Sequence, residues 1–378
     1  MRLVFAALFI LLTGCQSTSS LTSVREVEKL VKQINKQPEN LPRVIEQTQR
    51  SKKAIEQDIK QVKLALSALK EIVESIWGKE NVKLPSAKKY VKYSNDYKAR
   101  AIVDFEKGVV TVETIAKKQP LIKLKQAIAT TLLSPANPND TDIFSSDAPQ
   151  LGAEPFLYQQ IIDQDEKAIR YQWRANRFAD YLIKQKLIKS DGIHSVQRAL
   201  VNRHQHLRKE KYSKYVLASA RRYNIAPDLI YAIIETESSF NPFAVSHANA
   251  YGLMQVVPST AGKDVYQKVK QKPGQPSKSL LFKPEDNIDI GSAYLHLLKK
   301  RYLAKINNSE SKHYSVISAY NGGAGNVFNT FNPNREKAIN NINKLSSKSV
   351  FWALTNKHPR SESRRYLKKV TTNQTKYQ

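Results

Sequence analysis

The sequence predicts an α+β N-terminal domain with a small antiparallel sheet, followed by a mainly α domain. Two observations predict this order. Near residues 98–114, apolar side chains recur at every second position, which is typical of strands. From residue 213 onward, one helical pattern follows another, with Gly and Pro between them. The length of 378 residues suits two domains and a leader, and 41% hydrophobic residues can supply ordinary cores.

The first 15 residues carry a targeting pattern. Met1-Arg2 precedes an apolar run over 3–12, which is too short for a permanent membrane helix of about 20 residues. Leu12-Thr13-Gly14-Cys15 then resembles a lipobox, the cleavage site of bacterial lipoprotein signal peptides. On this interpretation Cys15 is acylated, and Gln16 after it implies sorting to the outer membrane, facing the periplasm. An ordinary signal peptide is the alternative.

The next segments are a tether and a helix. Residues 16–25 are rich in Ser and Thr and predict a flexible tether, and an N-terminal helical and α+β domain is expected over 26–190. Its first part carries a heptad seam, in which apolar residues recur in alternating steps of four and three. The seam fits either a helix packed on its own domain or a stalk that self-associates. Its members are Ile55, Ile59, Val62, Leu66, Leu69, Val73 and Ile76.

Two β-hairpins are expected in this domain. Each has two apolar arms joined by a polar or Gly-containing turn. The first runs from 101–105 through 106–108 to 110–114, and the second from 156–162 through 163–166 to 168–173.

Helices are expected on either side of the second hairpin, at 121–133 and 174–189, with a Pro- and Asn-rich loop over 134–152. Residues 191–212 are basic and polar and predict a linker, in which three histidines lack the spacing of a metal site. The second domain is then expected over 213–378.

The stretch Pro227–Pro242 holds the strongest candidate for chemistry. Three isoleucines between 230 and 234 form the apolar stripe of a helix that begins at Pro227. Glu237 shares this stripe, whereas Glu235 points to nearly the opposite side. Desolvation on an apolar face raises the pKa of a carboxyl and lets it hold a proton near neutral pH, as a general acid requires. A Glu in an exposed last helical turn is the structural alternative.

Two further motifs follow it. In Ala250–Gln255, a Gly lets the backbone approach a ligand, and Gln255 can bond to sugar amides and hydroxyls. In Ala319–Gly325, Tyr320 and Asn321 place an aromatic ring and an amide before a Gly cluster. Taken singly, these motifs also fit a turn over a core Leu/Met pair and a Gly-capped helix end.

Together, in this order and spacing, the motifs Glu-Ser, Gly-Leu-Met-Gln and Ala-Tyr-Asn-Gly-Gly resemble the lysozyme-like lytic transglycosylase domain. Further segments are similar to membrane-bound lytic murein transglycosylases, so that the resemblance covers roughly residues 70–370. The segment 26–70 is expected to be a helical region additional to the part that carries the resemblance. The similar segments are 74–78, 90–93, 113–116, 154–158, 178–182 and 362–367.

The resemblance implies a lysozyme-like catalytic domain over 213–378 and a peptidoglycan lytic exotransglycosylase. Such an enzyme cleaves the β-1,4 bond between N-acetylmuramic acid and N-acetylglucosamine and forms 1,6-anhydro-N-acetylmuramic acid. Glu237 would act as acid and then as base, and the substrate's acetamido group would stabilise the anomeric carbon. The implied substrate-binding residues are Ser246, Gly252, Met254, Gln255, Tyr320, Asn321 and Tyr366. Relatives often carry a second Ser where this chain has Ala248, which puts one polar contact in doubt.

The sequence gives no reason to pair a second carboxylate with Glu237, although ordinary glycosidases use two. The acids considered sit in loops or at helix starts: Asp264, Glu285, Asp286 and Asp289. A hydrolase similar to goose-type lysozyme, with a second carboxylate, and a non-catalytic wall-binding lipoprotein are the alternatives. No metal or cofactor is expected.

The net charge of +28 predicts attraction to polyanions. Nucleic acid is not an expected partner, because the chain lacks an interleaved aromatic and basic motif. The expected partners are peptidoglycan glycan strands and a membrane, the latter through the lipid on Cys15. The sequence leaves open a partnership with cell-wall synthesis or division machinery.

Overall fold

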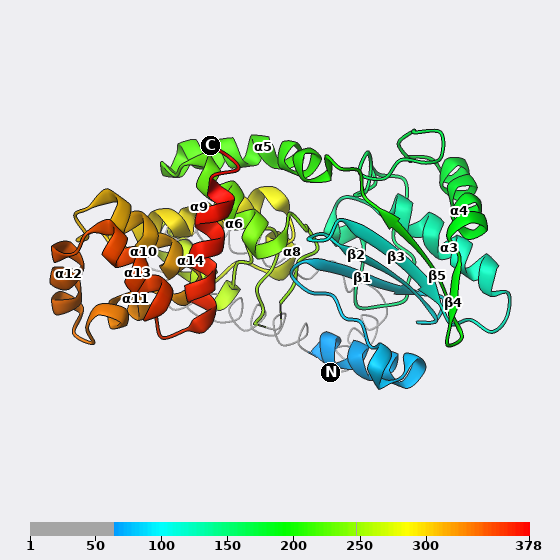
Figure 1. Ribbon diagram of the computed structural model, residues 1–378, viewed down its shortest axis with the longest axis horizontal. Coiled ribbons are helices and arrows are strands. Elements are labelled where there is room, and N and C mark those ends of the chain that lie inside the picture. The colour runs from blue at the N-terminus through cyan, green and yellow to red at the C-terminus, as the bar shows by residue number, and fades with distance from the viewer. Residues whose placement is uncertain (1–63, 247) are drawn as a thin grey trace, which may run out of the picture.

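The computed structural model describes residues 64–246 and 248–378. Figure 1 shows a sheet with flanking helices at one end and a cluster of helices at the other. The lipobox with Cys15, the tether and the seam positions 55, 59 and 62 lie outside the described residues. Within these ranges, no helix is both long and apolar enough to cross a membrane.

The sheet is antiparallel and has the order β1-β2-β3-β5-β4. The first predicted hairpin is confirmed as β2 and β3, in which Val103 pairs with Val110 and Gly108, at φ +66°, closes the turn. The strands are β1 Lys89–Ser94, β2 Ala99–Asp104, β3 Val109–Thr114, β4 Ile188–Ser190 and β5 Ile193–Ala199.

Strand β1 was not predicted because it is covered on both faces. Four successive residues, from Tyr90 to Tyr93, are buried, so its sequence lacks the alternation of a half-exposed strand. On one face, Val73 and Trp77 of the helix at 64–77 pack with Val91 and Tyr93. Where the seam is described, from Leu66 to Ile76, the structure therefore confirms a helix packed on its own domain.

Helices α3 (Pro120–Leu133) and α4 (Gln172–Lys186) pack beside each other and against the sheet. The helix predicted at 121–133 is confirmed, and the one predicted at 174–189 ends earlier, at Lys186, because β4 follows. A short 3-10 helix, Pro138–Asp140, interrupts the predicted loop.

The second predicted hairpin is wrong. Only one bridge, between Ile162 and Ala168, joins its arms. The backbone amides of Tyr158 and Gln160 donate to carbonyls three residues back, so this arm forms successive turns and cannot pair as a strand. The polar run does turn, because the Asp163 carboxylate accepts from the backbone amides of Asp165 and Lys167. The second arm ends inside α4.

The predicted linker over 191–212 is also wrong. Strand β5 pairs with β3 from His194 to Ala199, with Val196 opposite Val112, and α5 begins at His204. Near the edge of a sheet, polar side chains can face water while the backbone pairs, and this gives a linker-like composition. Only Val196, at 2% exposure, marks the buried face of this strand.

The helical part confirms the predicted succession of helices. Its core is continuous with that of the N-terminal part. Two π-helical turns, Pro258–Gly262 and Leu298–Tyr302, precede α7 and follow α9. The helices are α5 His204–Tyr223, α6 Pro227–Ser238, α7 Lys263–Lys268, α8 Lys278–Leu281, α9 Pro284–Leu297, α10 Ser309–Gly322, α11 Ala324–Phe331, α12 Arg335–Lys344, α13 Ser347–Asn356 and α14 Ser361–Gln374.

Candidate active site

Helix α6 places Glu237 on the face that the sequence indicated. Ile230, Ile233 and Ile234 are fully buried, and Glu237 on the same face is partly buried. Glu235 points elsewhere, because its carboxylate accepts from Lys376 Nζ at 2.8 Å and from the hydroxyl of Tyr377 at 3.0 Å. The two acids therefore point in different directions from the helix and have different neighbours.

Burial raises the pKa of Glu237 from 4.5 to about 8. The nearby hydroxyl of Tyr366 lowers this pKa, the negative charge of Glu362 raises it, and the positive charge of Lys88 lowers it. Burial is the largest of these effects, so the carboxyl holds its proton at neutral pH. A protonated carboxyl at that pH can act as a general acid.

Two tyrosines surround this carboxyl. Tyr366 of α14 is 7% exposed, and its hydroxyl makes no hydrogen bond of standard geometry within the described chain, although it lies close enough to act on the pKa of Glu237. Tyr320 of α10 donates to the carbonyl of Met254 at 2.9 Å. Burial and the charge of Glu237 raise the pKa of both tyrosines, so both hydroxyls keep their protons.

The loop after Val245 is built around Gly252, whose φ of +71° favours glycine. A side chain at this position would lie 2.4 Å from Asn287 Nδ2 and from the carbonyl of Leu281. The buried Asn287 of α9 donates to the carbonyls of Tyr251 and Leu281 and accepts from the amide of Met254 at 2.8 Å. Gly252 therefore permits the close approach through which Asn287 holds the loop.

Sequence reasoning missed Asn287 and Ser238 as supports of the site. The hydroxyl of Ser238 donates to the carbonyls of Ile234 and Leu253, which ties the end of α6 to the loop. The sequence pattern that could have indicated a buried Asn287 is a neutral amide directly before the apolar Ile288 in an expected helix. Such a side chain is normally buried only when hydrogen-bonded.

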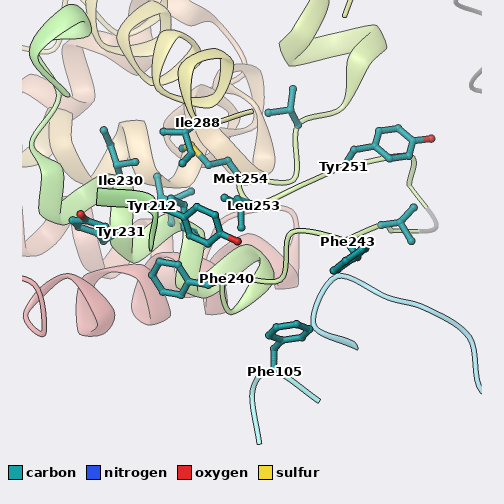
Figure 2. Packing of buried hydrophobic residues seen from close by; sticks show 14 of the residues in the cluster. Phe105, Tyr212, Ile230, Tyr231, Phe240, Phe243, Tyr251, Leu253, Met254 and Ile288 are labelled. Carbon is teal, nitrogen blue, oxygen red and sulfur yellow. The ribbon is translucent and has the colours of Figure 1, made fainter. Parts of the chain in front are cut away.

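The remaining predicted substrate residues have different surroundings. The Met254 side chain is fully buried and packs on Gly291 of α9, and Figure 2 shows it among core residues. Gln255 donates to the carbonyl of Gly252 and closes its own turn. The Ser246 hydroxyl accepts from the amides of Ala248 and Ala250, so it shapes the loop.

Asn321 links α10 to the start of α14. Its side-chain oxygen accepts from the hydroxyl of Ser363 at 2.6 Å, and its amide donates to Glu362 at 3.4 Å. Tyr320 and Tyr366 are therefore neighbours of Glu237, although they lie up to 129 positions from it in the sequence. Asn321 bonds to Glu362, whose charge also acts on Glu237.

The negative charge of a second carboxylate, that of Glu362, raises the pKa of Glu237. The sequence reasoning did not consider Glu362 as a second carboxylate of the site. Of the acids that were considered, Asp289 bonds to Arg222 and Lys270, and Asp264 bonds to Tyr302. Over the described ranges, no group of three or more His, Cys, Asp or Glu residues is arranged to hold a metal ion.

Comparison with known proteins covers both parts of the chain. Residues 55–211 match the family model for the N-terminal domain of membrane-bound lytic murein transglycosylase C, and residues 214–343 match the transglycosylase SLT domain. The chain is 48% identical over 310 residues to membrane-bound lytic murein transglycosylase C of Yersinia pestis (strain Pestoides F) and equally to that of Yersinia pseudotuberculosis serotype O:1b (strain IP 31758). Each match covers 81% of this chain and 86% of the relative. The solved 70 kDa soluble lytic transglycosylase of Escherichia coli is 27% identical, with a TM-score of 0.34 over 45% of this chain and 25% of that chain.

Proposed function

The chain belongs to the membrane-bound lytic murein transglycosylase C family and is a peptidoglycan lytic transglycosylase, and from this premise we propose that Glu237 is its single catalytic acid and base. The observation that carries the proposal is the raised pKa, about 8, of a carboxyl on an otherwise apolar helix face. A group protonated at neutral pH can donate, and the same group, once ionised, can accept.

In the first step, protonated Glu237 transfers its proton to the glycosidic oxygen between N-acetylmuramic acid and N-acetylglucosamine. The bond from that oxygen to the anomeric carbon breaks, and the acetamido group of the same sugar stabilises the positive carbon. Glu237, now a carboxylate, takes the proton of the sugar's 6-hydroxyl, and that oxygen closes the 1,6-anhydro ring. The proton balance returns Glu237 to its starting state, and no water is consumed.

The residues around Glu237 are proposed to line the substrate cleft. Tyr320 and Tyr366 offer rings and hydroxyls beside the carboxyl, and Asn321 offers an amide. The Met254 side chain is buried, so its loop is proposed to meet the substrate through backbone atoms while the side chain anchors the loop in the core. The proposed contacts are Ser246, Gly252, Met254, Gln255, Tyr320, Asn321 and Tyr366.

The enzyme is proposed to work at a membrane surface. Acylation of Cys15 would anchor it to the outer membrane, facing the periplasm, and more than one acyl chain would make the anchor durable. The net charge of +28 supports retention near anionic wall polymer and lipid head groups. We also propose that cleavage is exolytic and that the catalytic domain covers residues 213–378. Contacts with the cell-wall synthesis or division machinery are proposed as well.

The test is digestion of purified peptidoglycan, with product masses measured for the wild type, Glu237→Gln and Glu235→Gln. We expect anhydro products from the wild type, none from Glu237→Gln, and near wild-type release from Glu235→Gln, because that residue faces Lys376. Products heavier by one water would indicate a hydrolase, for which Glu362 would be the candidate second carboxylate. Wild-type release by Glu237→Gln would refute the assignment.

A further inference from the structure

The turn directly after the catalytic helix has an unfavourable backbone conformation. Helix α6 ends at Ser238, one residue after Glu237, and the next two residues, Ser239 and Phe240, have φ of +51° and +62°. Residues other than Gly adopt this left-handed region at a cost, and a bulky Phe does so rarely. Such a turn persists only where its surroundings hold it.

Two side chains, those of Arg208 and Asn241, connect this turn to the N-terminal part. Arg208 Nη1 donates to the carbonyl of Ser239 at 2.7 Å and to the carbonyl of Phe105, at the end of β2, at 3.1 Å. Asn241 is fully buried, and its amide donates to the carbonyl of Ala87, before β1, at 3.0 Å. The backbone around the end of α6 is therefore held in register with the edge of the N-terminal sheet.

Packing at the same place is aromatic. The rings of Tyr90 and Phe243 lie 4.8 Å apart, and those of Phe156 and Phe243 lie 5.1 Å apart. Figure 2 shows Phe105 and Phe243, which belong to the same core cluster and come from the two parts. These contacts pack the two parts together. Ring contacts are not directional enough to fix the position of a backbone carbonyl relative to the sheet.

Arg208 is an unusual residue to find in this position. It is 3% exposed, its two Nη1 bonds go to backbone carbonyls, and its guanidinium lies 5.0 Å from the ring of Phe105. Burial and the charge of Arg208 lower the pKa of His204, one turn earlier, to about 4, so that neighbour is neutral and does not repel it. Burial lowers the pKa of Arg208 itself to about 10. This value is still well above neutral pH, so Arg208 remains charged.

A cavity of about 210 Å³ lies beside this contact, and Arg208, Ser239 and Phe105 all line it. The gap between the two parts is therefore not filled by apolar packing here. A shorter side chain at position 208 would leave two carbonyls without their donor and would open the turn to the cavity.

From these contacts we infer that Arg208 is a positioning residue for the reaction. It holds the carbonyl of Ser239 at a fixed distance from the N-terminal sheet, and this fixes the turn that sets where the carboxyl of Glu237 lies. The inference rests on the proposed role of Glu237. It also gives the N-terminal part a function in catalysis, although that part contains no residue of the reaction itself.

The test compares Arg208→Gln and Arg208→Lys with Arg203→Gln in the full chain. Arg203 is exposed, precedes the same helix and serves as the control. Release of anhydro products from peptidoglycan is measured as kcat and KM across pH. We expect Arg208→Gln to lower kcat by about tenfold or more, since small displacements of a reacting group have large effects, with KM changed by less than about threefold. Arg208→Lys keeps a charged donor and should recover part of kcat.

The pH profile separates positioning from simple loss of fold. The groups that face Glu237 are Tyr366 and Glu362 from α14, Tyr320 from α10, and Lys88 from the N-terminal part, and none of them is altered in these variants. A loosened turn admits water to Glu237, so the alkaline limb of kcat should move to lower pH by about half a unit or more.

Wild-type kcat and profile in a folded Arg208→Gln would overturn the inference, and so would a lower kcat with an unmoved alkaline limb. If Arg208→Gln does not fold, the same two readouts in Arg208→Lys decide. Glu237→Gln measured alongside keeps the two proposals distinct. Full activity there would refute the proposed function, whereas loss of activity there with a wild-type-like Arg208→Gln would refute only the positioning role.

Discussion

Replacing Glu237, the proposed catalytic acid, should make the protein more stable at neutral pH. Glu237 has a folded-state pKa of about 8 against the ordinary value of 4.5 for this side chain, because burial disfavours its charged form. A carboxyl whose folded-state pKa is raised contributes stability at low pH and loses it as the pH rises toward the folded-state value. Gln has nearly the same size and does not ionise, so Glu237→Gln removes this loss.

The size of the effect follows from the two pKa values. The free energy of unfolding of the wild type falls, relative to that of Glu237→Gln, by about 1.4 kcal/mol for each pH unit above 4.5. At pH 7 the variant should be more stable by about 3 kcal/mol, and above pH 8 the difference should stop growing. Near pH 4 the two proteins should be almost equally stable.

The assay is urea unfolding of the wild type and Glu237→Gln at several pH values from 4 to 9, with linear extrapolation to water. Glu235→Gln is the control, because it removes an ion pair with Lys376 on the other side of the same helix and should be slightly destabilising. A difference between wild type and Glu237→Gln that does not change with pH would refute the reasoning, since it would mean that Glu237 titrates normally in the fold.

The remaining predictions concern the frame of the site and its charge. Gly252→Ala should lower the free energy of unfolding by at least about 2 kcal/mol, because the added Cβ would lie 2.4 Å from Asn287 and from Leu281 at a φ of +71°. Gly325→Ala is the control, because the space around Gly325 is open. Equal stabilities of the two variants in urea unfolding would contradict the close approach. Tyr366→Phe and Glu362→Gln should move the alkaline limb of kcat in opposite directions, up in pH for the first and down for the second, because the Tyr366 hydroxyl lowers the pKa of Glu237 and the Glu362 charge raises it. Shifts of the same sign in a pH–rate series would show that the limb reports another group.

Local patterns predicted a large part of the fold. The alternation at 101–114 predicted β2 and β3 because one face of each strand is buried in the main core, whereas residues 102, 104, 109, 111 and 113 on the other face are only partly buried. The second hairpin failed because local turns bond to the amides of Tyr158 and Gln160, which strand pairing would need. Strand β5 was missed because its pairing partner, β3, is about 80 positions earlier, and pairing across that distance leaves little trace in composition.

For the site, the sequence by itself determined which acid lies on the apolar face of its helix, because helix geometry sets the faces of Glu235 and Glu237 whatever the rest of the chain does. Only the tertiary structure decided what surrounds that acid. The carboxylate of Glu362, the clamp of Asn287 on the loop and the bridge of Arg208 to the N-terminal sheet all join distant segments. The physical reason is that desolvation, charge proximity and hydrogen bonding depend on distance in space, and a sequence pattern fixes such distances only within one helix or hairpin.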